Sequence, residues 1–297
     1  MNILVIGHSV VDNIIEKDRR SIKPGGIFYT VISLLSQVEP GDKIFICTNI
    51  NDDSAKLFNV AYDHVENEFI KNVNSIPRVE LVVGESGERK EIYSEIPENL
   101  ILPEKDLDRF DGILINMITG YDLSLSQLKE LRKNCNGIIY FDVHTFSRSV
   151  DEKGNRIFRR ITDFNLWAEC IDILQANESE LLTLSDQNEE AIIVEELFTY
   201  GIKQIIITRA EKGATVFFSE DNSVKKVHKD ALQTNVVNKV GCGDVFGAVY
   251  FYNYIKNKNV LLALEQANLF AGIATTYSKT KDFLNLKRDA NKRVNKK

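Results

Sequence analysis

The sequence predicts an α/β protein with three layers, α/β/α, in which helices cover both faces of a mostly parallel central sheet. Two observations predict this fold class. Short, nearly continuous apolar runs recur along the chain, as expected for parallel strands that are buried on both faces. Segments with the apolar spacing of helices separate these runs. With 297 residues, of which 43% are hydrophobic, the chain suffices for one large domain that spans 1–297.

The apolar runs and the helical patterns alternate. The runs predict strands over 2–6, 43–48, 112–116, 138–141, 171–175 and 204–208. Helical spacing predicts helices over 27–38, 127–134, 189–200, 243–256 and 260–277. Pro40-Gly41 ends the first of these helices. The Lys- and Arg-rich residues 279–297 predict a solvated helix or a frayed tail.

One pair of segments departs from the alternation. Val79–Val83 and Glu91–Tyr93 flank Gly84-Glu85-Ser86-Gly87, which indicates a β-hairpin, and the stretch after Gly7 supplies further strands. We therefore expect a small β lid, formed by about 9–24 and 79–96, over the strand ends. Because exposed sheet edges invite pairing, we also expect a homodimer that is joined through this lid.

Charge and cysteine content exclude several classes of protein. The net charge of −6 argues against a chain-wide electrostatic surface for nucleic acid. The four cysteines are far apart and form no C-x-x-C pair, which indicates reduced thiols. The apolar run near the N-terminus is too short for a signal peptide or a membrane span. We expect a cytoplasmic protein without nucleic-acid or membrane partners.

The most informative stretch is the glycine-rich segment at 236–247. Val236-Val237 predicts a short strand, and a glycine-flanked turn, Gly241-Cys242-Gly243-Asp244, opens a long helix. Glycines let consecutive N–H groups point into one space, and the helix N-terminus adds positive potential, so the turn can hold a phosphoryl group. A carboxylate in such a turn repels phosphate, but it is useful if it takes a proton from an attacking hydroxyl.

Two other interpretations of the turn stay open at this point. Gly241, Gly243 and Gly247 loosely imitate the dinucleotide fingerprint G-x-G-x-x-G, although only about fifty residues follow, too few for the rest of a two-mononucleotide fold. Alternatively, Asp244 is simply a capping residue at the start of a helix.

Further segments of the chain narrow the interpretation of this turn. Gly241 to Asp244 resembles the G-A-G-D signature of the ribokinase-like (pfkB) carbohydrate and nucleoside kinases. Asn177-Glu178-Ser179-Glu180 is similar to the N-x-x-E motif of this family, and the segment from Thr208 to Gly213 is similar to its T-x-G-x-x-G. Near the start of the chain, residues 7–12 match a strand-end G-x-x-x-x-D, and residues 25–26 match a double glycine before the first long helix. The motifs occur in the order of the family and cover nearly the whole chain.

The resemblance implies a role for each matching position. Asp244 would be the general base, and the N–H groups of Gly241, Cys242 and Gly243 would stabilise the transferred phosphate. Glu180 would organise Mg²⁺ through water, which suits an ion that dehydrates reluctantly. The residues of the ATP site would be Asn177, Thr208, Gly213, Lys239 and Asn268. Those of the acceptor site would be Asp12, Gly25, Gly26, Thr30 and Arg148.

Several positions depart from the family pattern. Asn238 and Lys239 replace the acidic residue and the threonine that usually precede G-A-G-D, which leaves activation by a monovalent cation open. Thr30 stands where many of the sugar kinases have asparagine, so the acceptor is not expected to be bound as in ribokinase. Arg148 can serve an acceptor or the nucleotide phosphates. His144 is interpreted as structural, because one carboxylate base suffices for this chemistry.

The sequence thus predicts a kinase that transfers the γ-phosphate of ATP to a hydroxyl of a sugar, cyclitol or nucleoside. A catalytically silent relative that binds a sugar or nucleotide as a sensor is the alternative from another class. A nicotinamide-dependent oxidoreductase is a weaker third interpretation. The acceptor itself is not named by the sequence.

Overall fold

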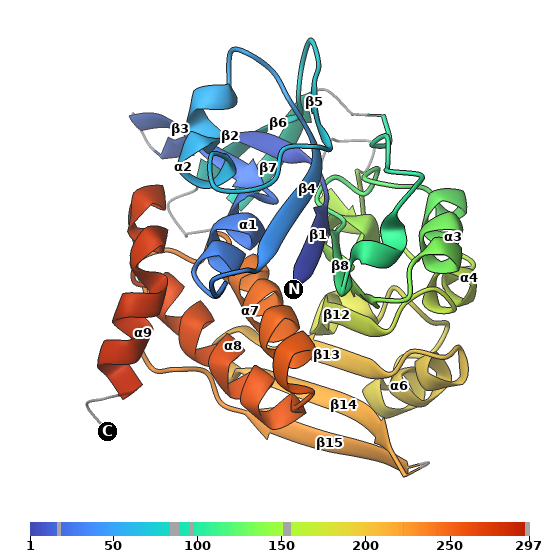
Figure 1. The fold of residues 1–297 in the computed structure, drawn as a ribbon. Coiled ribbons are helices and arrows are strands. Elements are labelled where there is room, and N and C mark those ends of the chain that lie inside the picture. The colour runs from blue at the N-terminus through green and yellow to red at the C-terminus, as the bar shows by residue number, and fades with distance from the viewer. Residues whose placement is uncertain (17–18, 84–88, 95–97, 151–155, 222, 295–297) are drawn as a thin grey trace.

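A large sheet forms the centre of the computed structural model, which describes residues 1–16, 19–83, 89–94, 98–150, 156–221 and 223–294 (Figure 1). Within these residues the sheet has nine strands in the order β15-β14-β13-β12-β9-β8-β1-β4-β5. The strands are β1 (Asn2–Ile6), β4 (Lys43–Ile50), β5 (Ile70–Asn72), β8 (Gly112–Asn116), β9 (Ile138–Asp142), β12 (Ile173–Asn177), β13 (Gln204–Thr208), β14 (Ala214–Glu220) and β15 (Ser223–Lys229). β14 pairs antiparallel with both β13 and β15, and the other pairs are parallel.

Helices cover both faces of this sheet, as the alternating pattern predicted (Figure 1). One face packs against α1 (Phe28–Leu35), α2 (Ala55–Tyr62), α7 (Cys242–Asn257), α8 (Val260–Ala274) and α9 (Leu286–Val294). The other packs against α3 (Leu125–Asn134), α4 (Phe164–Ala168), α5 (Glu178–Leu181) and α6 (Glu190–Thr199). Strand β1 shows why its run is continuously apolar, because Ile3 and Val5 enter one core while Leu4 and Ile6 enter the other.

A separate small sheet lies at one end of the large one (Figure 1). Its order is β3 (Arg19–Gly26), β2 (Ser9–Glu16), β6 (Arg78–Val83) and β7 (Arg89–Ser94). β6 and β7 form the predicted hairpin, whose turn residues 84–87 lie outside the described part of the chain. The small sheet is therefore confirmed, whereas a homodimer through it stays a prediction.

Short elements complete the fold. They are the 3-10 turns η1 (Leu107–Arg109), η2 (His144–Ser147), η3 (Ala210–Lys212) and η4 (Thr280–Asn285), and the two-stranded pair β10 (Arg148–Val150) and β11 (Arg156–Phe158). No helix among the described residues is long and apolar enough to cross a membrane.

Two sequence-based predictions of local structure are wrong. Residues 236–237 form no strand, because the N–H groups of Val237 and Asn238 donate to the carbonyl of Thr275 at the end of α8, at 2.8 and 3.0 Å. The basic tail is not simply solvated. One side of η4 and α9 is buried in the core of the α7–α8 face, through Phe283, Leu286 and Ala290. The strands β14 and β15 were not predicted.

Candidate active site

Two cavities lie on either side of the loop 239–244, at the carboxyl ends of the parallel strands. The first has a volume of about 350 Å³ and is lined by the loop together with residues from β13, α8 and the segment 231–236. The second has a volume of about 280 Å³ and is lined by the loop together with β2, α1, β6 and His144. Lys239 and Gly243 line both cavities. The loop is thus the wall that the two cavities share.

Gly241 gives the loop its shape. It caps α7 with φ +77° and ψ 0°, in the left-handed region that an L side chain rarely adopts. A Cβ atom at this position would also lie 2.4 Å from Cγ of Tyr29 in α1, so the loop rests directly on this ring. The N–H of Cys242 donates to the carbonyl of Lys239 at 3.4 Å, while a Cβ atom at Gly243 would meet nothing within 4 Å. The loop therefore faces open space at Gly243.

Asp244 lies in the first turn of α7 and lines the second cavity. Its Oδ1 accepts a hydrogen bond of 2.6 Å from Nδ2 of Asn116, which ends β8. Desolvation raises the pKa of Asp244, whereas the charge of His144 and the hydrogen bond from Asn116 act to lower it. A carboxyl group with a raised pKa that faces a cavity is suited to accept a proton from a bound hydroxyl.

Asp12 faces the same cavity from β2 in the small sheet. Burial, and then the charge of Asp244, raises its pKa to about 7. Gly25 on the neighbouring strand leaves room for this carboxyl group, since a Cβ atom there would lie 2.5 Å from both carboxylate oxygens. Gly26 lines the cavity with φ +63°, and a Cβ atom there would lie 2.1 Å from the carbonyl oxygen of His8. Gly26 is therefore sterically required, whereas a side chain at Gly25 would displace the carboxyl group of Asp12.

His144 also lines the second cavity, although it was expected from the sequence to be structural. Its φ of +38° is unusual for a residue with a side chain, and Nδ1 lies 2.8 Å from Oγ1 of Thr145. Burial acts to lower the pKa of His144, but the charges of Asp244, Asp142 and Glu180 outweigh it and raise the pKa. His144 thus supplies positive charge to a group of carboxylates.

The first cavity contains the predicted nucleotide residues: Asn177, Thr208, Gly213, Lys239 and Asn268. Gly213 has φ +94°, and a Cβ atom there would lie 2.0 Å from the carbonyl oxygen of Lys229. Asn268 is buried, and its Nδ2 donates to the same carbonyl at 3.3 Å. Much of the remaining wall is apolar, with Leu232, Val236, Phe246 and Ala271.

Glu180 and Asn177 form the capping box that the sequence allowed. Glu180 Oε2 accepts from the N–H of Asn177 at 2.9 Å, and Asn177 Oδ1 accepts from the N–H of Glu180 at 2.9 Å. Glu180 is buried, and desolvation raises its pKa. Among the described residues no cluster of three His, Cys, Asp or Glu side chains is arranged to hold a metal ion. A lone carboxylate fits Mg²⁺ that keeps most of its water and binds phosphate oxygens.

Two predicted acceptor residues lie elsewhere in the described structure. Thr30 is buried in α1 and accepts a hydrogen bond of 3.2 Å from Nδ2 of Asn116, without lining the second cavity. Arg148 begins β10, with its guanidinium carbon 3.6 Å from the centroid of the Phe158 ring. Its charge acts to lower the pKa of Glu180, so it lies on the side of the predicted metal carboxylate.

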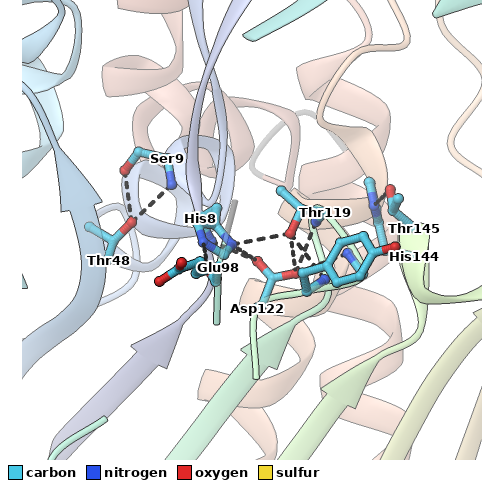
Figure 2. A network of polar contacts seen from close by, with 10 residues as sticks. His8, Ser9, Thr48, Glu98, Thr119, Asp122, His144 and Thr145 are labelled. Carbon is cyan, nitrogen blue, oxygen red and sulfur yellow. Dashed lines mark hydrogen bonds and ion pairs between the residues drawn. The ribbon is translucent and has the colours of Figure 1, made fainter. Parts of the chain in front are cut away.

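A buried polar network supports the segments that follow β1 and β8 (Figure 2). Asp122 Oδ1 accepts from the N–H of His8 at 2.8 Å and lies 2.9 Å from its Nδ1. Oδ2 accepts from Thr119 N–H at 2.9 Å and from Gly120 N–H at 3.1 Å, while Nε2 of His8 lies 3.2 Å from the carbonyl of Glu98. Burial acts to raise the pKa of Asp122, but these contacts outweigh it and lower the pKa. The network fixes the base of the second cavity, which Ile118 lines.

Sequence reasoning missed Tyr29, Asn116 and the cavity role of His144. Asn116 carried a weak signal, because it is the polar end of an otherwise apolar strand, Gly-Ile-Leu-Ile-Asn. Tyr29 carried none, since an aromatic residue on an apolar helix face is ordinary core. Only the fold brings α1 and β8 beside the loop.

A family model and a similar protein both agree with the resemblance to the pfkB kinases. The model of the pfkB family carbohydrate kinases matches residues 152–286. A cytidine kinase of Thermococcus kodakarensis is 25% identical over 285 residues, covering 90% of this chain and 95% of that protein.

Solved structures share the fold over almost the whole chain. An E. coli protein described as ribokinase II, in complex with ATP and Mg²⁺, superposes with a TM-score of 0.77 at 17% identity, covering 100% of this chain and 99% of that chain. A pyrophosphate-dependent kinase of the ribokinase family, complexed with a pyrophosphate analogue and myo-inositol, superposes with a TM-score of 0.71 at 17% identity, covering 96% of this chain and 99% of that chain. The ribokinase-like fold is therefore confirmed, while relatives differ in their phosphoryl donor.

Proposed function

We propose that the chain is a member of the pfkB family of carbohydrate kinases and that it transfers the γ-phosphate of ATP to a hydroxyl of a neutral nucleoside. The observation that carries the proposal is the position of the loop 239–244 as the wall shared by two cavities. One cavity takes the donor and the other the acceptor. Only at this wall can the terminal phosphate and the attacking hydroxyl meet.

The walls of the donor cavity favour ATP over pyrophosphate. Leu232, Val236, Phe246 and Ala271 give it an apolar surface, and its volume is about 350 Å³. A purine base buries its faces against such a surface, whereas pyrophosphate has no apolar part to bury. Lys239 reaches this cavity as a cation and lies 3.9 Å from Glu211 in an exposed ion pair. We infer that Lys239 exchanges this weak pair for the phosphates of the donor.

The charges of the acceptor cavity favour an uncharged ligand. Asp12 and Asp244 line it together with Lys239 and His144, so the cavity has no clear excess of positive charge that would attract a phosphorylated sugar. Opposite them lie apolar side chains, among them Val79 and Leu81 from the small sheet and Ile118. A nucleoside matches this division, with hydroxyls for the carboxylates and a base for the apolar wall. The similarity to a cytidine kinase supports this choice over a cyclitol.

The proposed reaction follows from these positions. The acceptor hydroxyl donates its hydrogen bond to Asp244, which takes the proton as the hydroxyl oxygen attacks the γ-phosphorus and the bond to the β-phosphate oxygen breaks. The N–H groups at the start of α7 stabilise the charge on the transferred group, aided by the positive end of the helix. Glu180 would organise Mg²⁺ through water, and the ion would neutralise part of the phosphate charge. The small sheet closes the acceptor cavity and excludes water.

A crossed panel tests the proposal. The purified protein is incubated with ATP or pyrophosphate against cytidine, other nucleosides, ribose and myo-inositol, and release of ADP or phosphate is measured. We expect ADP release that depends on ATP and on a nucleoside. Turnover with pyrophosphate but not with ATP would contradict ATP as the donor. Turnover confined to free sugars or inositol would contradict a nucleoside as the acceptor. Binding of nucleosides without any turnover would favour the silent sensor.

Glu180→Gln tests the role assigned to the metal carboxylate. Glutamine retains an oxygen for the capping box, so the fold should persist, but it attracts hydrated Mg²⁺ more weakly. We expect half-maximal activity to require about tenfold more magnesium, with the KM of the acceptor unchanged. A magnesium titration of ADP release measures this.

Glu178→Gln is the matched control for this variant. Glu178 lies two residues away but is engaged with Arg209 at 2.6 Å instead. Its variant should keep the magnesium dependence of the wild type. If both variants behave alike, Glu180 has only its capping role.

The pH dependence of acceptor capture tests Asp12. Its pKa of about 7 means that the free protein at pH 6 holds the proton, whereas at pH 8 the carboxylate can accept hydrogen bonds from the hydroxyls of the acceptor. We expect kcat/KM for the acceptor to rise about tenfold from pH 6 to pH 8, and this rise to vanish in Asp12→Asn. An unaltered rise in the variant would assign the titration to another group.

The same pKa shift has a consequence for stability. The folded protein retains a proton at Asp12 that the unfolded chain releases, so rising pH from 3.8 toward 7 lowers the free energy of unfolding of the ligand-free protein. Asp12→Asn should remove this contribution, as thermal melts at several pH values can show.

A further inference from the structure

Asn116 is a buried amide behind the proposed general base. It ends β8 with 1% of its surface exposed, and its Nδ2 donates both to Asp244 Oδ1 at 2.6 Å and to Thr30 Oγ1 at 3.2 Å. Its own Oδ1 is one of two buried side-chain polar atoms in the described residues that have no hydrogen-bond partner. Both hydrogen bonds of this amide are thus made through one end.

The orientation of the Asn116 amide indicates which ionisation state of Asp244 it favours. Buried polar atoms nearly always have a hydrogen-bond partner, so the cost of leaving the amide oxygen unpaired must be offset by a strong hydrogen bond of the amide nitrogen. Here Nδ2 gains a short hydrogen bond to a carboxylate, which is stronger than a bond between neutral groups. If the amide were turned round, its oxygen would face Oδ1, and only a protonated Asp244 could then supply a hydrogen. The observed arrangement therefore suits the ionised base.

We propose that Asn116 is a positioning residue for phosphoryl transfer, which keeps Asp244 ionised and engages Oδ1 so that Oδ2 takes the proton of the acceptor. This inference rests on the proposed function of Asp244. Asn116 does not itself line the acceptor cavity, and it acts through the carboxylate alone. Thr30, where many of the sugar kinases have an asparagine, anchors the amide from α1.

Other charged groups face Asp244, and they set what the loss of Asn116 would do. Asp12 from β2 and Lys239 line the same cavity, and His144 and Asp142 follow from the end of β9. Once the amide is removed, the charge of His144 still acts to lower the pKa of Asp244 against the effect of desolvation. We therefore expect the pKa of Asp244 to rise in a variant without the amide, since desolvation disfavours the charged form.

Asn116→Leu removes the amide with little change in volume. We expect kcat to fall by about tenfold and the acid limb of the kcat–pH profile to move to higher pH, because fewer molecules hold Asp244 as carboxylate. The KM of the acceptor should change less than twofold, since the cavity wall is untouched. An unchanged profile in an active, folded variant would overturn the inference.

Gln204→Leu is the matched control. Gln204 is also a buried amide, but it lies at the amino end of β13, whereas Asn116 lies at the carboxyl end of β8, and it accepts a hydrogen bond of 2.7 Å from Tyr250. This variant should lose stability without a shift of the profile. If Gln204→Leu shifts the acid limb equally, loss of stability explains the effect and Asn116 has no positioning role.

A titration without substrates separates this inference from the proposed function. The side-chain carboxyl carbons of ¹³C-labelled aspartates are followed by NMR against pH, and the Asp244 signal is identified by its loss in Asp244→Asn. Asn116→Leu should raise the titration midpoint of Asp244. A raised midpoint in a protein without kinase activity on any substrate would support the effect of Asn116 on Asp244 and contradict the proposed reaction. An unchanged midpoint would contradict the inference about Asn116. Asn116→Ser, which is smaller, replaces the leucine variant if that variant does not fold.

Discussion

Asp244→Asn should lower kcat by about two orders of magnitude or more while the protein stays folded. Asparagine has nearly the same volume, and its oxygen can still accept the hydrogen bond from Nδ2 of Asn116. What disappears is the oxygen that takes the proton as the acceptor hydroxyl attacks. Single-turnover measurement of ADP formation with saturating acceptor isolates this step from product release.

Binding measurements supply the control for this variant. The carboxylate of Asp244 lies beside the proposed site of the transferred phosphate, so its removal should leave the affinity for ATP unchanged or slightly higher. Isothermal titration of ATP into the variant measures this. A folded variant that binds ATP and turns over like the wild type would refute the role of Asp244 as general base.

Gly241→Ala should impair both folding and transfer. The φ of +77° would be strained with a side chain, at a cost of about 1–2 kcal/mol, and the new methyl group would lie 2.4 Å from Cγ of Tyr29. Overpacking of this kind adds about 1–3 kcal/mol unless the loop moves. Because the loop carries the N–H groups that we propose stabilise the transferred phosphate, a shift of the loop that relieves this clash should reduce kcat by more than tenfold. Denaturant unfolding and steady-state kinetics on the same preparation separate the two effects.

Gly201→Ala is the matched control for backbone strain. Gly201 has φ +98°, but a Cβ atom there would meet nothing within 4 Å, and it follows α6 away from the loop. It should lose comparable stability to strain alone and keep its kcat. In a Tyr29→Ala background, which lacks Cγ and Cδ1, Gly241→Ala should cost less stability than it does beside the tyrosine ring. Equal kcat in Gly241→Ala and Gly201→Ala would contradict the support of the loop by Tyr29.

The centre of the parallel sheet could be predicted because strands such as Asn2–Ile6 are nearly continuous apolar runs, whereas the edge strand β5, Ile-Lys-Asn, carries no such run. The tail could not, although Phe283, Leu286 and Ala290 have helical spacing, because the many lysines and arginines between them outweigh this short stripe. The false strand at Val236-Val237 has a similar cause. Two β-branched residues indicate a strand, yet the N–H groups of Val237 and Asn238 donate to the carbonyl of Thr275 at the end of α8.

The two carboxyl groups of the proposed acceptor site show which contacts sequence motifs can predict and which they cannot. Asp12 and Asp244 are far apart in sequence, but β2, which carries Asp12, follows β1, and α7, which begins with Asp244 in its first turn, follows β15. Both segments leave the carboxyl ends of strands, where open α/β sheets bind ligands, so their meeting was predictable. Asn116 was not, because its contact with Asp244 depends on α7 crossing the end of β8 at hydrogen-bond distance. Such a contact follows from packing and leaves no periodic signal.

Tyr29 has a consequence for laboratory evolution of acceptor choice. Its ring lines the acceptor cavity, supports Gly241 and packs 5.2 Å, centroid to centroid, from Phe283 in the basic tail. A smaller residue at Tyr29 would admit larger acceptors but would release the loop at the same time, so gain in substrate range and loss of turnover are coupled at this position. Val79 and Leu81 line the same cavity from the small sheet. Productive libraries should begin at these two positions, and changes at Tyr29 should emerge only together with changes that stabilise the loop.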